Sequence, residues 1–405
     1  MSGRLEIAGK ALERPLCNHC LGRLFATVST GLSNAQRGAI VRFTSAGISP
    51  LPRDRDCAVC GSLFSEVQKF AKLGVSASEP YEHSNFLVGT KIDPEVIEAE
   101  EQLWIDLDAR ETESIRSEMN REIGKVIEAL LEVPVEFAKP DIVLLVDTMF
   151  DRVMVDVAPL FAYGRYRKHS RTLPQTRWPC RECRGKGCPR CDGRGRMYES
   201  SVQDLIGPVV MRHAEGEVDF FHGMGREDVD ALMLGNGRPF VIEIRRPRKR
   251  SLDHGAMERE INACAEGIVE VEGMRESSRS ELRRIKSAAY PKTYRVRVRF
   301  EADFEHRKLN DIVRILDEKP ICQLTPHRVA HRRANLERTR TVHRMEIESI
   351  EAREVVFVVE AESGTYIKEL MHGDDGRTRP SVAEIVGVAC EVTELDVIHI
   401  EDKGA

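Results

Sequence analysis

Eight of the eleven cysteines stand in C-x-x-C pairs, and this spacing constrains the fold more than any other feature of the 405-residue chain. One such pair brings two thiolates to one metal ion, and two pairs complete a closed tetrahedral site. The first two pairs supply Cys17, Cys20, Cys57 and Cys60. They predict a structural zinc ion that stabilises a small N-terminal module, residues 1–75.

The other two pairs stand in CRECRGKG and CPRCDGRG, a tandem repeat of the pattern C-x-x-C-x-G-x-G. Their cysteines are Cys180, Cys183, Cys188 and Cys191. The glycines allow the backbone to turn tightly around an ion. The repeat resembles the zinc repeats of the J-domain co-chaperones, which implies a second structural zinc within residues 179–200. The isolated cysteines are predicted to be core residues: Cys264, Cys322 and Cys390.

Membrane and secreted classes of protein fit the sequence poorly. No apolar run reaches the ~18 residues that a membrane span requires. The opening segment, MSGRLEIAGKALERP, lacks the apolar centre of a secretion signal. We therefore expect a cytoplasmic protein with no membrane partner. In such a reducing compartment cysteines are thiols or metal ligands rather than disulfides.

Basic residues are concentrated in three clusters, although the net charge of the chain is −5. Residues 165–196 contain eleven Lys or Arg against two acidic residues, and residues 245–250 and 328–344 contain five cations and six arginines. A single cluster is often only a solvated face. Three clusters on an acidic chain favour binding of RNA or DNA phosphates. In the first cluster, three cations are expected to contact phosphate: Arg165, Arg167 and Lys168.

Residues 76–178 are predicted to form an α/β domain. Apolar residues recur at three- and four-residue spacing from Ile115 to Leu130, which is typical of an amphipathic helix. DIVLLVD (141–147) and RVMVDVAPLF (152–161) indicate two strands, and the basic aromatic segment AYGRYRKHSR follows them. This order resembles the THUMP domain, with which RNA-modifying enzymes hold the ends of tRNA.

Residues 201–405 are predicted to form an antiparallel-rich α+β domain. TYRVRVRF (293–300) alternates apolar and charged side chains, as a strand with one buried face does. Further strands are predicted at 218–221, 238–245, 344–348 and 355–361, and helices at 202–205, 278–289 and 309–317.

Several enzyme classes are excluded. Neither G-x-G-x-x-G nor G-x-x-x-x-G-K-[ST] occurs, so kinases, dehydrogenases and typical methyltransferases are not expected. P-C-x-x-C at 179–183 and H-x-E at 213–215 match two halves of the zinc deaminase signature, but in the reverse order. Cys188 and Cys191 would moreover close that metal site to water.

The segment HGMGREDVDALMLGNGRPF, residues 222–240, places glycines, acids and an arginine between two predicted strands. Its pattern alone fits a structural turn with a solvated acidic cluster. GRED (225–228), however, resembles the G-R-x-D element around the catalytic aspartate of pseudouridine synthases. KTY (292–294) and SGTYIKEL (363–370) resemble the K-x-Y and S-G-T-Y-I-R elements of that superfamily, and all three come in its order.

The combination of GREDVDA…GNGRPF, HRR and GTYIKELMHGDDGRTRPS resembles the archaeal and eukaryotic tRNA pseudouridine synthase family with an N-terminal zinc/THUMP region. The resemblance covers nearly the whole chain. It implies an α+β protein with a zinc-stapled module, a THUMP-like α/β domain, and an antiparallel-rich pseudouridine synthase catalytic domain at 201–405. It also implies isomerisation of uridines 54 and 55 in the T-loop, with tRNA as partner. No organic cofactor and no obligate protein partner are inferred.

Pseudouridine formation needs an ionised carboxylate near C1′ of a flipped-out nucleotide, as nucleophile or as base. The resemblance assigns this role to Asp228, and Asp230 is the rival. Lys368 stands where relatives usually carry arginine and would keep the carboxylate charged. Tyr294 and Tyr366 would hold the uracil, although Tyr294 also fits the first core position of its strand. Tyr366 and Lys368 share a face if residues 364–368 are extended, and not if they are helical.

A second function is compatible with the same features. Zinc modules and basic patches also suit a noncatalytic tRNA-binding scaffold. Activity that survives loss of the Asp228 carboxylate would favour that alternative.

Overall fold

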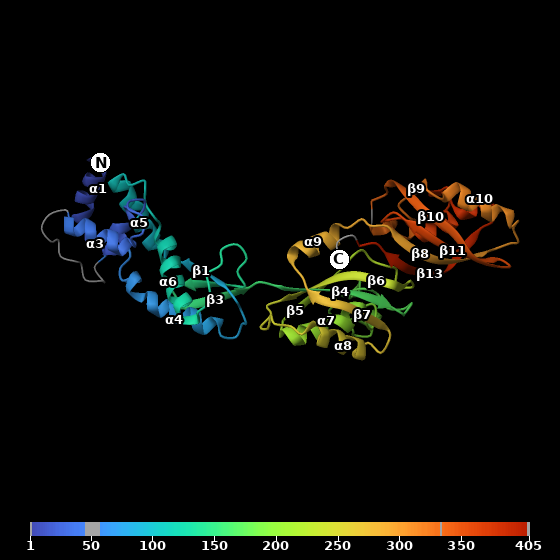
Figure 1. Cartoon of the computed structure of the whole chain (residues 1–405), viewed down its shortest axis with the longest axis horizontal. Coiled ribbons are helices and arrows are strands. Elements are labelled where there is room, and N and C mark those ends of the chain that lie inside the picture. Colours follow the sequence, from blue (N-terminus) through green and yellow to red (C-terminus); the bar gives the residue numbers. More distant parts are fainter. Residues whose placement is uncertain (1, 45–56, 333, 403–405) are drawn as a thin grey trace. The chain divides into compact units, whose positions relative to one another are not determined.

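The structure is a computed structural model that describes residues 2–44, 57–332 and 334–402 (Figure 1). The chain forms two compact units. The first comprises Met1–Ala158 and Arg246–Arg250, and the second comprises Pro159–Arg245 and Ser251–Ala405. Each unit has its own β-sheet, so each is described separately.

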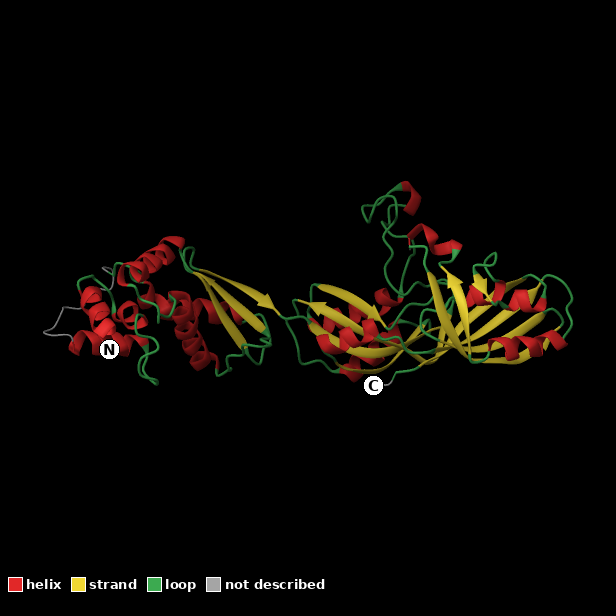
Figure 2. Cartoon of the chain, turned by 90° about the horizontal axis from the view of Figure 1, so that it is seen from above, coloured by secondary structure: helices red, strands yellow, loops and turns green. Residues whose placement is uncertain are grey.

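The first unit combines helices with a small three-stranded sheet (Figure 2). Strand β1 (Phe86–Lys91) pairs in parallel with β2 (Ile142–Asp147), and β2 pairs antiparallel with β3 (Arg152–Val157). The helices are α1 (Ser2–Leu12), α2 (Asn18–Arg23), α3 (Asn34–Thr44), η2 (Leu63–Glu66), α4 (Val67–Ser78), α5 (Pro94–Leu107) and α6 (Ile115–Leu131). The predicted amphipathic helix is confirmed as α6, which the Ser114 side chain caps by accepting a hydrogen bond from the Ser117 backbone N–H.

One hydrophobic core runs through the whole first unit. Cys20 and Cys60 are buried in the same cluster as Phe70 of α4 and Phe86 of β1. Helix α4 also packs against α6. The expected boundary after residue 75 therefore lies inside α4 and inside a core that both sides share.

The second unit is built on a ten-stranded sheet with the order β12-β9-β10-β11-β8-β13-β6-β4-β7, in which β5 pairs with β6. The strands are β4 (Leu160–Lys168), β5 (Val218–Gly223), β6 (Leu232–Arg245), β7 (Val269–Glu276), β8 (Lys292–Phe300), β9 (Lys319–Leu324), β10 (Glu337–Glu351), β11 (Glu354–Ala361), β12 (Thr378–Arg379) and β13 (Cys390–Ile400). The helices are η3 (Pro189–Cys191), α7 (Val202–Ala214), α8 (His254–Cys264), α9 (Arg279–Ser287), α10 (Arg307–Leu316), η4 (His327–Arg332), α11 (Ile367–His372) and α12 (Val382–Val386).

Among the described strands of this sheet, one pair is parallel, and it joins β13 to the start of β6. Asp396 pairs with Leu232 and Val397 with Met233, whereas the other described strand pairs of the ten-stranded sheet are antiparallel. Two separate hydrophobic cores accompany the two parts of the sheet, and Tyr294 packs against both. The loop from β5 to β6, residues 224–231, leads into β6 next to this parallel pairing.

The segment AYGRYRK lies in β4 of the second unit, not in the THUMP-like unit where the sequence pattern placed it. Strand β4 pairs with β6 and β7. The predicted strand 152–161 is two strands, β3 and β4, interrupted at Ala158 and Pro159. Proline has no N–H for a strand ladder, which explains the break.

The glycine-rich segment LGNG lies within a strand rather than in a turn. Strand β6 begins at Leu232, not at residue 238. Gly235 has φ +56, and a Cβ there would lie 1.7 Å from the carbonyl oxygen of Ile398 on β13. These glycines therefore mark a close approach of two strands. Strands β7, β9 and β13 were not predicted.

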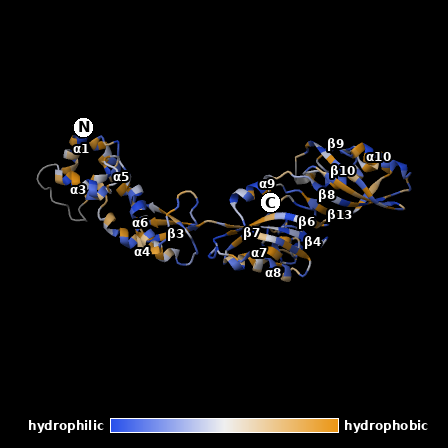
Figure 3. Cartoon of the chain, viewed as in Figure 1, coloured by the Kyte–Doolittle hydropathy of each residue, from blue (hydrophilic) through white to orange (hydrophobic). Residues whose placement is uncertain are grey.

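Apolar residues, orange in Figure 3, are distributed over the helices and strands of both units. None of the described helices combines the length and the apolar character that a membrane span requires.

Candidate active site and metal sites

A cavity of about 600 Å³ lies in the second unit and contains the predicted site residues. Asp228 of the loop 224–231, Tyr294 of β8, and Tyr366 and Lys368 around the start of α11 all line it. The sequence resemblance therefore brought together residues that are up to 140 positions apart. The size falls within the ~300–1,000 Å³ range of ligand sites.

Asp228 is held by an arginine that the sequence pattern marked only as part of the basic cluster 328–344. Arg328 of η4 lies 3.0 Å from the Asp228 carboxylate and 2.7 Å from the buried Glu369 carboxylate of α11. Burial opposes the charge of Arg328, but the hydrogen bond to Glu369 and the Asp228 charge together raise its pKa. Arg328 is therefore a fixed cation that Glu369 orients and that holds the Asp228 carboxylate through an ion pair.

Asp230, the rival carboxylate, has a different partner. The Lys368 Nζ lies 2.6 Å from Asp230 but 3.9 Å from Asp228. Burial opposes ionisation of Asp230, and the hydrogen bond from Lys368 nevertheless lowers its pKa. Its side chain is 63% exposed, against 36% for Asp228. The nearest cation to Asp228 is thus Arg328, whereas Lys368 chiefly pairs with Asp230.

A buried polar network lies beneath the loop. Glu227 accepts one hydrogen bond from the Tyr166 hydroxyl, whose oxygen lies 2.9 Å from both carboxylate oxygens, and pairs with Arg238 at 2.9 Å. Gln175 donates to Tyr166 and to the Gly225 carbonyl, and Arg238 donates to the Met224 carbonyl. Each of these side chains contacts another, and the hydrogen bonds from Gln175 and Arg238 to the Gly225 and Met224 carbonyls fix the loop on the N-terminal side of Asp228.

Two cations of β4 and its following loop fix the other side. The completely buried Lys168 donates to the carbonyls of Leu173 at 2.8 Å and Val229 at 2.9 Å, and lies 3.5 Å from that of Asp228. Burial lowers the pKa of Lys168. Arg171 donates to the Asp230 carbonyl and pairs with Asp396 at 2.7 Å.

The structure contradicts the expected phosphate contact for the buried Lys168, and it gives Arg165 and Arg167 partners within the protein. Lys168 is buried, Arg165 donates to the carbonyls of Asn236 and Gly237, and Arg167 pairs with Glu272. These side chains form hydrogen bonds or ion pairs with residues that are distant in the sequence. The local sequence pattern therefore could not reveal their environment.

Both aromatic candidates face the cavity. Burial raises the pKa of Tyr294 to about 12, so its hydroxyl stays protonated. The buried Gln323 of β9 donates to the Tyr366 carbonyl and accepts from the Tyr366 N–H. Helix α11 begins immediately after Tyr366, so residues 364–368 are neither wholly extended nor wholly helical, and both Tyr366 and Lys368 line the cavity.

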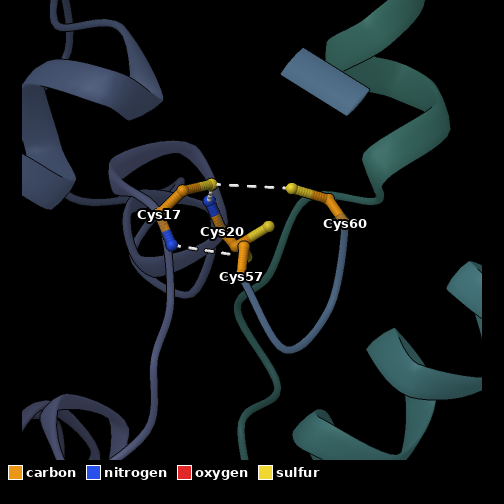
Figure 4. A group of neighbouring side chains, drawn as sticks. All are labelled: Cys17, Cys20, Cys57 and Cys60. Carbon is orange, nitrogen blue, oxygen red and sulfur yellow. Dashed lines mark hydrogen bonds between the residues drawn. The ribbon is translucent and has the colours of Figure 1, made fainter. Parts of the chain in front are cut away.

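The first four cysteines converge from two chain segments (Figure 4). Their sulfur atoms lie within 4.8 Å of one another, and the Cys17 and Cys60 sulfurs are 3.7 Å apart. A tetrahedral ion with 2.3 Å bonds to sulfur requires edges of about 3.8 Å. The backbone N–H of Cys17 points to the Cys57 sulfur at 3.3 Å, which favours a thiolate. This group can hold a metal ion.

A buried arginine ties this cysteine group to the surrounding helices. Arg23 donates to the Cys20 sulfur at 3.1 Å, and it pairs with Glu100 of α5 and with Glu118 of α6. His19 stacks on Phe64 and contacts Glu118 at 2.7 Å. The cysteine group is therefore part of the core of the first unit.

The second four cysteines form a short surface segment, residues 180–191, here called the clip. Sulfur–sulfur distances are 3.8 Å for Cys180–Cys188, 3.8 Å for Cys183–Cys191 and 3.7 Å for Cys188–Cys191. The N–H groups of Gly187 and Gly195 point to sulfurs of the group at 3.1 and 3.2 Å. A Cβ at either glycine would meet a carbonyl oxygen, at 2.6 and 2.4 Å. The clip also can hold one metal ion.

The deaminase-like H-x-E is remote from this group in its contacts. His213 pairs with Glu260 of α8 at 2.6 Å. Four cysteines already form the group in the clip, which agrees with the expectation that Cys188 and Cys191 complete this site.

Comparison with known proteins gives a consistent result. The family described as "Pus10, C-terminal" matches residues 161–401, and "Pus10 THUMP domain, archaeal" matches residues 70–147. The proteins named tRNA pseudouridine synthase Pus10 from Halorubrum lacusprofundi and Methanothrix thermoacetophila are 43% and 39% identical to this chain. These alignments cover 98% and 95% of this chain, and 96% and 92% of the relatives.

Among solved structures, a Cbf5-Nop10-Gar1 complex is similar at 16% identity with a TM-score of 0.34. That similarity covers 59% of this chain and 48% of the other. The family matches, by contrast, span most of the sequence and confirm the resemblance seen in its motifs. The chain belongs to the Pus10 family, whose curated members carry the name tRNA pseudouridine synthase.

Proposed function

We propose that this protein converts uridines 54 and 55 in the T-loop of tRNA to pseudouridine in the cytoplasm, with Asp228 as the reacting carboxylate. The observation that carries the proposal is the placement of Asp228 in a cavity with Arg328, Tyr294 and Tyr366. The family supplies the reaction class, and the cavity supplies groups that suit it.

The reaction breaks the C1′–N1 bond of uridine, turns the uracil, and forms a C1′–C5 bond. Asp228 acts on the flipped nucleotide as nucleophile at C1′ or as base. Arg328, fixed by Glu369, pairs with the Asp228 carboxylate and orients it in the cavity. Tyr294 and Tyr366 offer ring faces that hold the uracil while its glycosidic bond is open.

The direct test uses an unmodified tRNA transcript. After incubation with the protein, carbodiimide treatment and primer extension should stop at positions 54 and 55. A stop at only one position narrows the substrate to that uridine. No stop at either position, with tRNA binding intact, supports the alternative of a noncatalytic tRNA-binding scaffold.

We also propose that each cysteine group binds zinc. Four thiolates at tetrahedral spacing form a closed structural site, and both groups have N–H donors to sulfur. Elemental analysis of protein purified without chelator should approach two zinc ions per chain. A value near one would leave only one of the sites, and a value near zero would remove both.

We propose that, within the basic stretch 165–196, the clip contacts tRNA. Four clip cations are exposed: Arg181, Arg184, Lys186 and Arg190. Within the described part of the chain none of these four side chains has a carboxylate partner. At the base of the clip, Trp178 lies 5.4 Å beneath the Arg226 guanidinium, and Arg226 lines the cavity. The clip is thus an exposed cationic surface connected to the cavity rim.

A further inference from the structure

The cations of the cavity fall into two sets. Six basic side chains line it: Arg226, Arg238, Lys286, Lys292, Arg328 and Lys368. Three of them pair with carboxylates, namely Arg238 with Glu227, Arg328 with Asp228, and Lys368 with Asp230. For Arg226, Lys286 and Lys292, the described residues supply no carboxylate within ion-pair distance. The cavity therefore has positive charge that its own acids do not balance.

Lys292 is the most constrained of the unbalanced cations. It is half-buried at the start of β8, and its Nζ donates to the Ser363 hydroxyl at 3.0 Å. An ammonium group has three donors, so two remain for a ligand. Burial and the nearby Arg238 charge lower the pKa of Lys292 to about 8. An anion placed here would relieve both costs.

The position of Lys292 relates it to the base-holding residues. Lys292 and Tyr294 are two residues apart on β8 and so point to the same face. Ser363 precedes Tyr366 in the turn that leads to α11. Lys292 also lies against the loop that carries Asp228, because a Cβ added at Gly225 of that loop would lie 3.7 Å from the Lys292 Nζ.

We propose that Lys292 and the Ser363 hydroxyl, in the cavity that Arg226 also lines, form a phosphate subsite for a phosphodiester that flanks the flipped uridine. An RNA nucleotide brings a phosphate on each side, which matches the unbalanced charge of the cavity. Lys292 is then a binding residue, whereas Arg328 and Lys368 serve the carboxylates. This inference rests on the proposed function, because it takes the cavity as the place that receives the uridine.

The test measures binding of a synthetic T-arm stem–loop RNA in three forms. One form is unmodified, and each of the other two has an uncharged methylphosphonate in place of one phosphodiester flanking the target uridine. Lys292→Met should weaken binding of the unmodified RNA about tenfold and lower its salt slope by ~0.7–0.9, the value of one phosphate contact. Lys292→Arg should restore most of the affinity. Lys319→Met, an exposed lysine outside the cavity, is the matched control and should change neither quantity.

The two methylphosphonate RNAs show whether Lys292 acts on one of the flanking phosphates. At one of the two positions the methylphosphonate should weaken wild-type binding by the same factor, and Lys292→Met should then cause no further loss. If wild-type protein binds both neutral-linkage RNAs as tightly as the parent RNA, the subsite does not exist, even if the variants fail to fold. A fall in kcat with unchanged Kd and salt slope in Lys292→Met would assign the lysine to proton transfer instead. Binding of the RNA does not require isomerisation. Absence of pseudouridine would therefore overturn the proposed function, whereas the binding measurements would still test the phosphate subsite.

Discussion

The cations of β4 and those of the clip belong to one basic stretch of sequence, yet they face opposite environments. Lys168 of β4 is buried and, with Arg171 of the loop after it, donates hydrogen bonds to backbone carbonyls of the loop that carries Asp228. Arg181 and Lys186 of the clip are exposed to solvent. The comparison teaches that the density of basic residues along a chain does not distinguish cations that could bind RNA from cations that hold the protein's own loops in place. The role of each cation depends on the direction of its side chain and on partners that are distant in the sequence.

The largest expected effect contrasts one lysine of β4, Lys168, with one lysine of the clip, Lys186. Lys168→Met leaves buried carbonyls unpaired, at ~1–3 kcal/mol each, so the free energy of unfolding should fall by about 2–4 kcal/mol. Displacement of Asp228 by even about 1 Å should lower kcat by about 100-fold. Thermal unfolding and single-turnover kinetics measure these effects. Lys186→Met in the clip is the control, and equal behaviour of the two variants would abolish the distinction.

Removal of the clip charges should have the next largest effect. Replacement of Arg181, Arg184, Lys186 and Arg190 by serine should raise the Kd for tRNA about 10-fold or more and lower the salt slope by about 3. Turnover at saturating tRNA should change much less than affinity, since such contacts are equal in ground and transition states. A filter-binding series in salt tests this. An unchanged slope would show that the clip is a solvated surface.

Metal loss in the clip should have a smaller effect than loss of its charges. Cys188→Ser should lower the zinc content from two ions to one per chain and weaken tRNA binding a few-fold, because the cations remain but lose their fixed spacing. Cys20→Ser removes a ligand from the buried core instead, so it should destabilise the first unit far more. Thermal unfolding that is equally affected by both substitutions would contradict the contrast between a core site and a surface site.

The smallest effect should come from Arg167 of β4. Its partners Glu270 and Glu272 are about half exposed, and such ion pairs contribute ~0–1 kcal/mol. Arg167→Gln should therefore leave the salt slope of tRNA binding unchanged. A drop in slope equal to one phosphate contact would return this strand to the RNA-binding surface.

The parts of the site that sequence predicted are those with local signals. The C-x-x-C pairs identified both cysteine groups, because ligand spacing is a short-range property. Resemblance identified Asp228, Tyr294 and Tyr366, which all line one cavity. Their roles in the reaction stay predictions.

Other parts were missed because tertiary pairing determines them. Arg328 looked like one cation among many, and only Glu369 in the folded chain orients it toward Asp228. Strand β4 was placed in the wrong unit because its partners β6 and β7 come much later in the sequence. Gly235 suggested a turn, although the true constraint is the nearby carbonyl of Ile398.

The central claim is that the Asp228 carboxylate performs the chemistry and Asp230 does not. The most direct measurement is pseudouridine formation at positions 54 and 55 by Asp228→Ala and by Asp230→Ala, each with its tRNA Kd. Asp228→Ala should form no detectable pseudouridine while its Kd stays within a few-fold of wild type, because affinity depends mainly on phosphate contacts. Asp230→Ala should retain activity. Full activity of Asp228→Ala, or loss of activity in Asp230→Ala alone, would contradict the account.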